Sequence, residues 1–304
     1  MFNDRPLWGV DLGGSKIECV ILESALNPVV IERQRIDTEG DQGYEHVLQR
    51  IQNLVNKMEW DTGLVPDEIG FGTPGSIDPE TGLLRGSNSQ HLTGQPIKQD
   101  LESMLDLPVV VQNDANCFAL AETRIGVVKS MAKPKDVVFG VILGTGVGGG
   151  LVIEGRLLRG RNLITGEWGH NFMDASGGSC YCGKSGCVET IISGPALEDY
   201  YWQQSGASMP LSQIVTEAKR ENAHATATVN RLIHYFGIGM SSIINMVDPD
   251  IIVVGGGVGN IDLLYTRGVE ETSKSVFSST MKTRIVKPQL GDSAGVFGAA
   301  FLTI

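Results

Sequence analysis

The chain has 304 residues, of which 41% are hydrophobic, and a formal net charge of −11 at pH 7. This length and composition predict a folded protein of about two domains and exclude a disordered chain. The acidic charge argues against a nucleic-acid surface, which requires clustered lysine and arginine.

The N-terminal residues lack the basic and apolar regions of a signal peptide. The longest uncharged stretch, 137–153, is too short and too rich in glycine to span a membrane. Three of the five cysteines fall within eight residues, a pattern typical of metal binding in a reduced cytoplasm. Cys19 and Cys117 lie in apolar segments and are expected in the core. We therefore expect a cytoplasmic protein with no membrane partner.

The first part of the chain predicts the element order β-β-β-α-β-α-β-α. Gly13-Gly14 predicts a hairpin between the first two strands. Strands are expected at 7–12, 16–22, 29–36, 68–72 and 108–112, and helices at 44–58 and 113–125.

The second part repeats this order in outline. Its strands are expected at 137–143, 149–153 and 250–254, and its helices at 226–247, 261–279 and 294–302. The apolar face of 226–247 predicts a core helix. Each half opens with strand, glycine turn and strand, so we expect two duplicated α/β lobes with a cleft between them.

Four metal-ligand residues lie close together in the sequence: His170, Cys180, Cys182 and Cys187. Cys₃His is a closed tetrahedral ligand set for structural zinc. Glu167 and Glu189 flank these ligands, and a zinc site would hold both carboxylates in place. This indicates a scaffold for a polar ligand; the alternative is a purely structural clip.

Three glycine turns could bind phosphate through backbone N–H groups that no Cβ shields. The first, 11–16, opens with Asp11, which could hold Mg²⁺ through water, but an ordinary hairpin remains the alternative. The second, 143–150, contains Gly144-x-Gly146-x-x-Gly149, yet a strand is expected to follow it where a dinucleotide fingerprint requires a helix. The third, 255–259, could contact an adenosine or simply pack tightly.

Asp114 lies at an expected strand-to-helix junction, in Gln112-Asn113-Asp114-Ala115-Asn116. An aspartate at this position could cap the helix or accept a proton from a substrate hydroxyl. The sequence leaves both roles open.

Five motifs occur in a characteristic order: Asp11-x-Gly-Gly-Ser-Lys16, Asn113-Asp-Ala-Asn116, Leu143-Gly-Thr-Gly-x-Gly-Gly-Gly150, Gly166-Glu-x-Gly-His170 and Cys180-x-Cys-Gly-x-x-Gly-Cys-x-Glu189. With them the chain resembles bacterial sugar kinases of the ROK family (repressor, open reading frame, kinase) over roughly residues 7–302. The resemblance implies an α/β, two-lobed actin/hexokinase-like (ribonuclease H-like) fold with a cleft between duplicated domains. It places a small domain at 1–115, with the C-terminal helix 292–304 packing back onto it, and a large domain with the zinc motif at 116–291.

The resemblance also assigns roles to residues, with Asp114 as the catalytic base. Substrate-binding residues are expected at Gly75, Asn88, Asn113, Glu167, His170 and Glu189. Mg-ATP is expected to bind Asp11, Gly13, Gly14, Ser15 and Lys16 in the first loop, Gly144, Thr145 and Gly146 in the second, and Gly255, Gly256 and Gly257 in the third. Structural zinc is expected on His170, Cys180, Cys182 and Cys187. The family usually has threonine in place of Ser15, and the retained hydroxyl makes this difference neutral.

The activity implied is transfer of the γ-phosphoryl group of Mg-ATP to the 6-hydroxyl of a hexose. Segments such as 75–82 and 181–184 look most like the fructokinase and mannokinase branch, so fructose or mannose is expected, with glucose next. The alternatives are an N-acetylglucosamine kinase, which 118–122 and 164–167 resemble, or a non-catalytic sugar-binding or regulatory ROK protein. Repressor members carry an N-terminal helix-turn-helix, for which a first strand near Leu7 leaves no room, so no nucleic-acid partner is expected. The family often forms homodimers, and we expect one here.

Overall fold

The computed structural model describes residues 4–87, 89, 91–131, 133 and 136–304. The contacts between residues divide the chain into two compact units. The first comprises the residues up to 126, 157–165 and 290–304, and the second comprises 127–156 and 166–289. This division differs from the expected boundary at residue 115, because the helix that follows that point packs within the first unit.

The first unit is built on a five-stranded sheet of order β3-β2-β1-β4-β7. Its strands are β1 (Leu7–Leu12), β2 (Lys16–Leu22), β3 (Val30–Asp37), β4 (Ile69–Thr73) and β7 (Val109–Asn113). β1, β2 and β3 form antiparallel pairs, whereas β1, β4 and β7 run parallel. The carboxyl ends of the three parallel strands therefore lie along one edge, where ligands commonly bind in α/β sheets.

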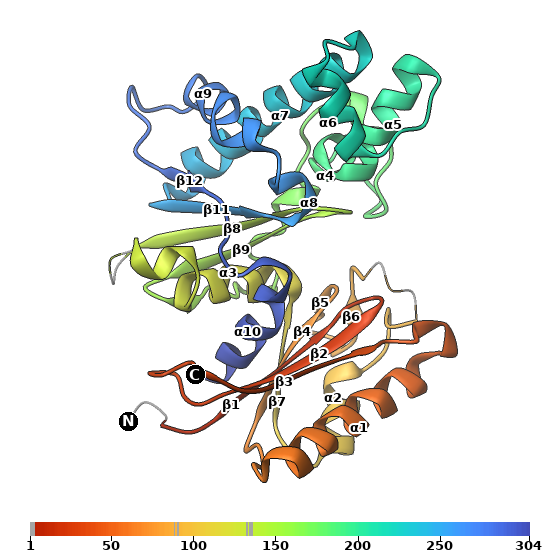
Figure 1. Cartoon of the computed structure of the whole chain (residues 1–304), viewed down its shortest axis with the longest axis vertical. Coiled ribbons are helices and arrows are strands. Elements are labelled where there is room, and N and C mark those ends of the chain that lie inside the picture. The colour runs from red at the N-terminus through yellow and green to blue at the C-terminus, as the bar shows by residue number, and fades with distance from the viewer. Residues whose placement is uncertain (1–3, 88, 90, 132, 134–135) are drawn as a thin grey trace. The chain divides into compact units, whose positions relative to one another are not determined.

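Helices cover both faces of this sheet. One apolar cluster joins it to α1 (Tyr44–Thr62) and α2 (Ile97–Leu105), and another joins its opposite face to α3 (Asp114–Arg124) and α10 (Ala294–Ala300). Figure 1 shows α1 and α2 on one side of the strands and α10 on the other. Glycines let α10 lie directly on the strands: a Cβ added at Gly70 would lie 1.8 Å from the carbonyl oxygen of Ala299. The unit also holds η1 (Gly40–Gln42), the hairpin β5 (Ser76–Ile77) and β6 (Leu84–Arg85), η6 (Gly291–Ser293) and η7 (Phe301–Thr303).

The second unit repeats this arrangement with a sheet of order β10-β9-β8-β11-β12. Its strands are β8 (Val137–Leu143), β9 (Val147–Ile153), β10 (Arg156–Leu157), β11 (Ile251–Gly255) and β12 (Arg284–Val286). β8 and β9 form an antiparallel hairpin, and β11 runs parallel to both β8 and β12. Each sheet thus places an antiparallel hairpin beside parallel strands, and the expected α/β fold is confirmed.

The core of the second unit lies between this sheet and the long helix α7 (Ala223–Val247), as the apolar face of the sequence predicted; Phe236 and Met240 are fully buried there. Its other helices are η2 (Val127–Ser130), η3 (Trp168–His170), η4 (Ala175–Gly177), α4 (Glu189–Ile192), α5 (Gly194–Ser205), α6 (Leu211–Lys219), α8 (Gly256–Gly259), η5 (Asp262–Tyr265) and α9 (Arg267–Ser273). Within the described part of the chain, no helix combines the length and apolar character that a membrane span requires.

The expected helix at 261–279 is wrong. This segment contains η5 and α9, separated by the non-helical backbone of Thr266, and no helix continues beyond Ser273. The hydroxyl of Tyr265 donates to the carbonyl oxygens of Val254 and Gly259, both at 2.8 Å, which anchors the segment to β11 and α8. These tertiary contacts override the local helical pattern.

Candidate active site

The junction between β7 and α3 places Asn113 and Asp114 at the carboxyl edge of the first sheet. Asn113 is the N-cap of α3: its side-chain oxygen accepts a hydrogen bond of 2.8 Å from the backbone N–H of Asn116. Asp114 is the first residue within the helix and is exposed, and its carboxylate accepts a hydrogen bond of 2.7 Å from the N–H of Ala115. The capping role that the sequence left open for Asp114 therefore belongs to Asn113.

Asp11 lies near the end of β1 and is largely enclosed. Its carboxylate lies so close to α10 that a Cβ added at Gly295 would be 2.5 Å from Oδ2. Burial and, after it, the carboxylates of Asp114 and Glu18 together raise the pKa of Asp11 to about 7, while Arg35 opposes the shift. Asp11 and Asp114 therefore lie close enough to influence each other's charge.

The first glycine turn forms the expected hairpin between β1 and β2. The N–H of Gly13 donates to the carbonyl oxygen of Lys16 at 2.9 Å, while Gly14, Ser15 and Lys16 are exposed. Thr38, which is fully buried, braces the turn: its hydroxyl donates to the carbonyl oxygen of Gly13, and its N–H donates to that of Ser15.

Gly75 occupies the turn after β4 with a φ of 91°, and a Cβ there would lie 2.4 Å from the carbonyl oxygen of Arg85. Only glycine fits this turn without strain. Asn88, the other substrate-binding residue expected in this region, lies outside the described residues.

The second unit brings the four expected metal ligands together. The donor atoms of His170, Cys180, Cys182 and Cys187 all lie within 4.8 Å of one another. Nδ1 of His170 is 3.6 Å from Sγ of Cys180, and the Sγ atoms of Cys182 and Cys187 are also 3.6 Å apart. The side chains of Cys19 and Cys117 are fully buried elsewhere, as expected, and burial raises the pKa of both thiols.

Two residues near this cluster, Trp168 and Glu189, bond to the start of β9. Trp168, which follows Glu167, is buried, and its ring N–H donates to the carbonyl oxygen of Gly148 at 3.0 Å. The carboxylate of Glu189, the first residue of α4, accepts a hydrogen bond of 2.9 Å from the N–H of Val147. Hydrogen bonds therefore join the segment that carries the metal-ligand cluster to the strand that follows the second glycine turn.

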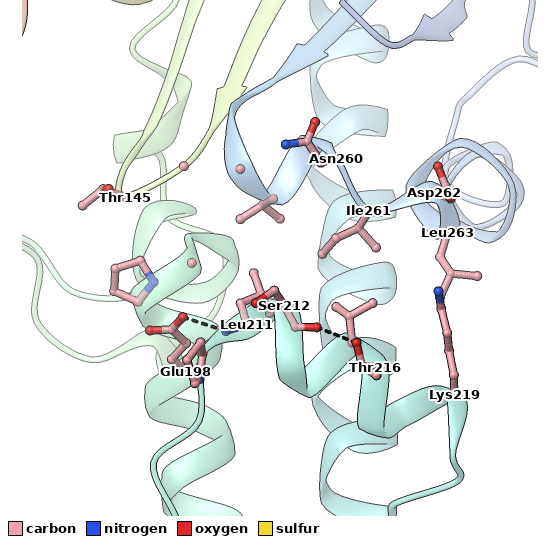
Figure 2. A pocket seen from close by; sticks show the side chains of 17 residues that line it. Thr145, Glu198, Leu211, Ser212, Thr216, Lys219, Asn260, Ile261, Asp262 and Leu263 are labelled. Atoms are coloured by element: carbon pink, nitrogen blue, oxygen red, sulfur yellow. Dashed lines mark hydrogen bonds between the residues drawn. The ribbon is translucent and has the colours of Figure 1, made fainter. Parts of the chain in front are cut away.

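A cavity of about 840 Å³ in the second unit unites the second and third glycine turns. It is lined by Gly144 and Thr145 on one side and by Gly257, Val258, Asn260, Ile261, Asp262 and Leu263 on another. The N-terminus of α5 and residues of α6 complete the wall: Gly194, Pro195, Glu198, Pro210, Leu211, Ser212, Val215, Thr216 and Lys219. In Figure 2, Thr145 lies at one side of the cavity and Lys219 and Asp262 at the other, with the start of α6 between them.

In the third turn, Gly255 to Gly257, one glycine is tightly packed and another is accessible. Gly256 has a φ of 81°, and a Cβ there would lie 2.2 Å from the carbonyl oxygen of Leu143. At Gly257 no described atom lies within 4 Å of the position of a Cβ, so its backbone is accessible from the cavity. The two interpretations of this turn, tight packing and ligand contact, thus apply to different glycines.

Comparison with known proteins assigns the family. The sequence model of the ROK family matches residues 7–304. The chain belongs to the ROK family.

Proteins of similar sequence and proteins of similar structure agree with this assignment. The chain is 36% identical to an N-acetyl-D-glucosamine kinase of Vibrio cholerae, over 98% of this chain and 99% of that protein. A ROK hexokinase from Thermus thermophilus has a similar structure, with a TM-score of 0.87, 28% identity and coverage of 98% and 99% of the two chains. A ROK glucokinase from Streptomyces griseus, in complex with glucose and AMPPNP, gives a TM-score of 0.78 and 27% identity, with the same coverage. This ROK protein is accordingly an ATP-dependent sugar kinase with their α/β fold.

Sequence analysis of this ROK protein missed part of the candidate site. The wall of the cavity formed by α5 and α6 carries no motif, and its residues are distant in the sequence from the glycine turns. Ser193 at the N-cap of α5 and Pro195 two residues later are local signals of a helix start there. The hydrogen bonds from Thr38 to the first glycine turn likewise could not be predicted, because Thr38 belongs to no motif.

Proposed function

We propose that this ROK kinase transfers the γ-phosphoryl group of Mg-ATP to the 6-hydroxyl of a hexose, and that the preferred hexose is N-acetylglucosamine. The observation that carries the proposal is the cavity in the second unit, where two of the expected nucleotide loops meet beside the metal-ligand cluster. Its volume of about 840 Å³ is within the range of small-molecule sites.

The cavity suits a nucleotide for chemical reasons. The backbone of Thr145 and Gly257, which lines the cavity, can approach phosphate groups. The apolar side chains of Leu211, Val215 and Ile261 can cover an adenosine. In the first unit, Asp11 and the turn from Gly13 to Lys16 remain proposed phosphate-binding residues. Bound Mg²⁺ would neutralise the charge that develops on the transferring phosphoryl group.

Asp114 is the proposed base. The 6-oxygen of the sugar forms a bond to the γ-phosphorus, the bond from this phosphorus to the β,γ-bridging oxygen breaks, and ADP leaves with the electron pair. The proton of the sugar hydroxyl passes to the carboxylate of Asp114. Because Asn113 caps α3, the carboxylate of Asp114 is not required to begin the helix.

The donor set of the cluster fits zinc. For zinc–sulfur bonds of about 2.3 Å, neighbouring ligands of a tetrahedral site lie about 3.7 Å apart. The two distances of 3.6 Å agree with this spacing. Four protein ligands leave no position for a reactive water, so the metal would act structurally. We propose that it positions Glu167 and Glu189 to bind sugar hydroxyls. His170 keeps the role of zinc ligand, because its Nδ1 faces Sγ of Cys180 and its Nε2 lies beside the hydroxyl of Tyr181. Gly75, Asn88 and Asn113 of the first unit remain proposed substrate-binding residues.

The identity of the sugar rests on the relatives. Two of them, from Vibrio cholerae and Yersinia pseudotuberculosis, are N-acetyl-D-glucosamine kinases that match nearly the whole chain at 36% and 33% identity. The expectation of fructose or mannose has no comparable support. We also keep homodimer formation and a cytoplasmic location as proposals based on the family.

The test is an assay of ADP release with Mg-ATP and, separately, N-acetylglucosamine, N-acetylmannosamine, glucose, fructose and mannose. The expected result is release stimulated most by N-acetylglucosamine, and its loss after zinc is removed by a chelator. Greater stimulation by another hexose would overturn the choice of sugar but not the kinase. No stimulation by any of the five sugars, in folded protein loaded with zinc, would contradict the proposed function and favour a sugar-binding protein without turnover.

A further inference from the structure

The carboxylate of Glu189 connects two parts of the proposed active site. Glu189 follows the proposed zinc ligand Cys187 by two residues and begins α4. Its Oε2 atom accepts a hydrogen bond of 2.9 Å from the N–H of Val147, the first residue after the loop formed by Gly144, Thr145 and Gly146. A residue of the zinc motif therefore holds the end of a proposed phosphate loop.

The fit between this carboxylate and the loop is close. A Cβ added at Gly146 would lie 2.6 Å from Oε2 of Glu189, nearer than carbon and oxygen atoms can approach without displacement. Nearby, the ring N–H of Trp168 bonds to the carbonyl oxygen of Gly148, which fixes the strand that follows the loop. The position of the carboxylate and the conformation of the loop thus determine each other.

We propose that Glu189 couples sugar binding to nucleotide binding. The inference rests on the proposed function, in which Glu189 binds the sugar and the loop binds the phosphates of ATP. One carboxylate oxygen holds Val147, and the other accepts a hydrogen bond from a sugar hydroxyl. A bound sugar fixes Glu189 and with it the loop; by thermodynamic reciprocity, a bound nucleotide strengthens sugar binding by the same factor.

The first test changes the loop and measures the sugar. In Gly146→Ala the added methyl group displaces the carboxylate of Glu189. We expect the affinity for N-acetylglucosamine, measured by calorimetry without nucleotide, to fall at least about fivefold. Gly144→Ala is the matched control, because a Cβ there meets only Cγ2 of Ile142, at 4.0 Å. This control should bind the sugar as the wild type does.

The second test changes the carboxylate and measures the nucleotide. Glu189→Ala removes the partner of Val147, so the affinity for AMPPNP without sugar should fall at least about threefold, within the range of single hydrogen bonds. Glu189→Gln is its control, since the amide oxygen can still accept from Val147 and should preserve nucleotide affinity. This test does not depend on whether Gly146→Ala folds.

The third measurement is the coupling itself. In the wild type, saturating N-acetylglucosamine should raise the affinity for AMPPNP at least about fivefold, and this factor should approach one in Gly146→Ala. If the wild type binds sugar but Gly146→Ala shows the same sugar affinity and the same coupling factor, the role of Glu189 as a coupling residue is overturned while the proposed function stands. If the wild type binds none of the five hexoses, the proposed function is overturned, and the coupling with it.

Discussion

The hydroxyl of Tyr181 lies 3.0 Å from Nε2 of His170, on the opposite side of the imidazole from the Nδ1 atom that faces Sγ of Cys180. The two rings also pack edge to face, with centroids 5.1 Å apart. Burial raises the pKa of Tyr181, and the carboxylates of Glu189 and Glu167 raise it further, so the hydroxyl keeps its proton at neutral pH. This hydroxyl holds the orientation of His170 in which Nδ1 is directed toward the cysteines.

Tyr181→Phe should weaken zinc binding. The variant keeps the ring that packs on His170 but loses the hydroxyl that orients the imidazole, and loss of such partners typically lowers metal affinity by about 10- to 100-fold. Competition with a chromophoric chelator measures the change. Tyr44→Phe is a suitable control, because Tyr44 makes its comparable hydrogen bond to Asp100 in the first unit. Equal zinc affinity in the two variants would show that Tyr181 does not orient the ligand.

Asp114→Asn should separate activity from stability. We expect kcat to fall by about 10²- to 10⁴-fold because the proton acceptor is lost. The melting temperature should change little, since Asp114 is exposed and Asn113 provides the cap. Asn113→Ala supplies the contrast in stability: loss of the N-cap should cost about 1 kcal/mol of unfolding free energy in denaturant titration. Near-normal turnover in Asp114→Asn would remove Asp114 from the role of base.

The parts of the site that could be predicted from the sequence are those encoded locally. The ligands His170, Cys180, Cys182 and Cys187 lie within one short segment, so their convergence needed little tertiary information, and the structure bears it out. The hairpins around both glycine turns were likewise predictable from the turns and the apolar runs beside them.

What the sequence could not supply depends on contacts between distant segments. The hydrogen bond from Val147 to Glu189 joins residues 42 positions apart, and the identity of neither residue predicts it. Whether Asp114 caps the helix depended on the residue at which helical backbone begins, a boundary that local patterns define poorly. The expected helix at 261–279 is interrupted at Thr266 and ends at Ser273, and just before the interruption Tyr265 bonds to carbonyl groups of Val254 and Gly259.

Asp11 should make stability fall as pH rises from about 4 to 7. Burial first, then Asp114 and Glu18, raise its pKa from 3.8 to about 7, so in this window the folded state binds more protons than the unfolded state. Unfolding free energy then declines with pH, by at most about 1.4 kcal/mol per pH unit. Asp11→Asn removes this contribution, so the stability of the variant relative to wild type should increase over the same window, measured by denaturant titration without Mg²⁺ or nucleotide. A difference between the two proteins that stays constant from pH 4 to 7 would contradict the shift.

Glu198→Ala should weaken nucleotide binding through the wall of the cavity. The residue before α6 is Pro210, which has no capping side chain, and the carboxylate of Glu198 instead accepts the N–H of Leu211 at 2.7 Å (Figure 2). Without this acceptor the first turn of α6, which carries Leu211 and Ser212 into the cavity, loses a helix-end hydrogen bond of about 1 kcal/mol.

We therefore expect the KM for ATP to rise about fivefold in Glu198→Ala, in line with that loss, while the KM for the sugar stays within error. Glu198→Gln retains an acceptor for the N–H of Leu211 and should keep the KM of the wild type. The two variants distinguish the hydrogen bond that Glu198 accepts from Leu211 from the negative charge of Glu198. If the KM for ATP rises as much in Glu198→Gln as in Glu198→Ala, the carboxylate acts on the nucleotide directly and not through the start of α6.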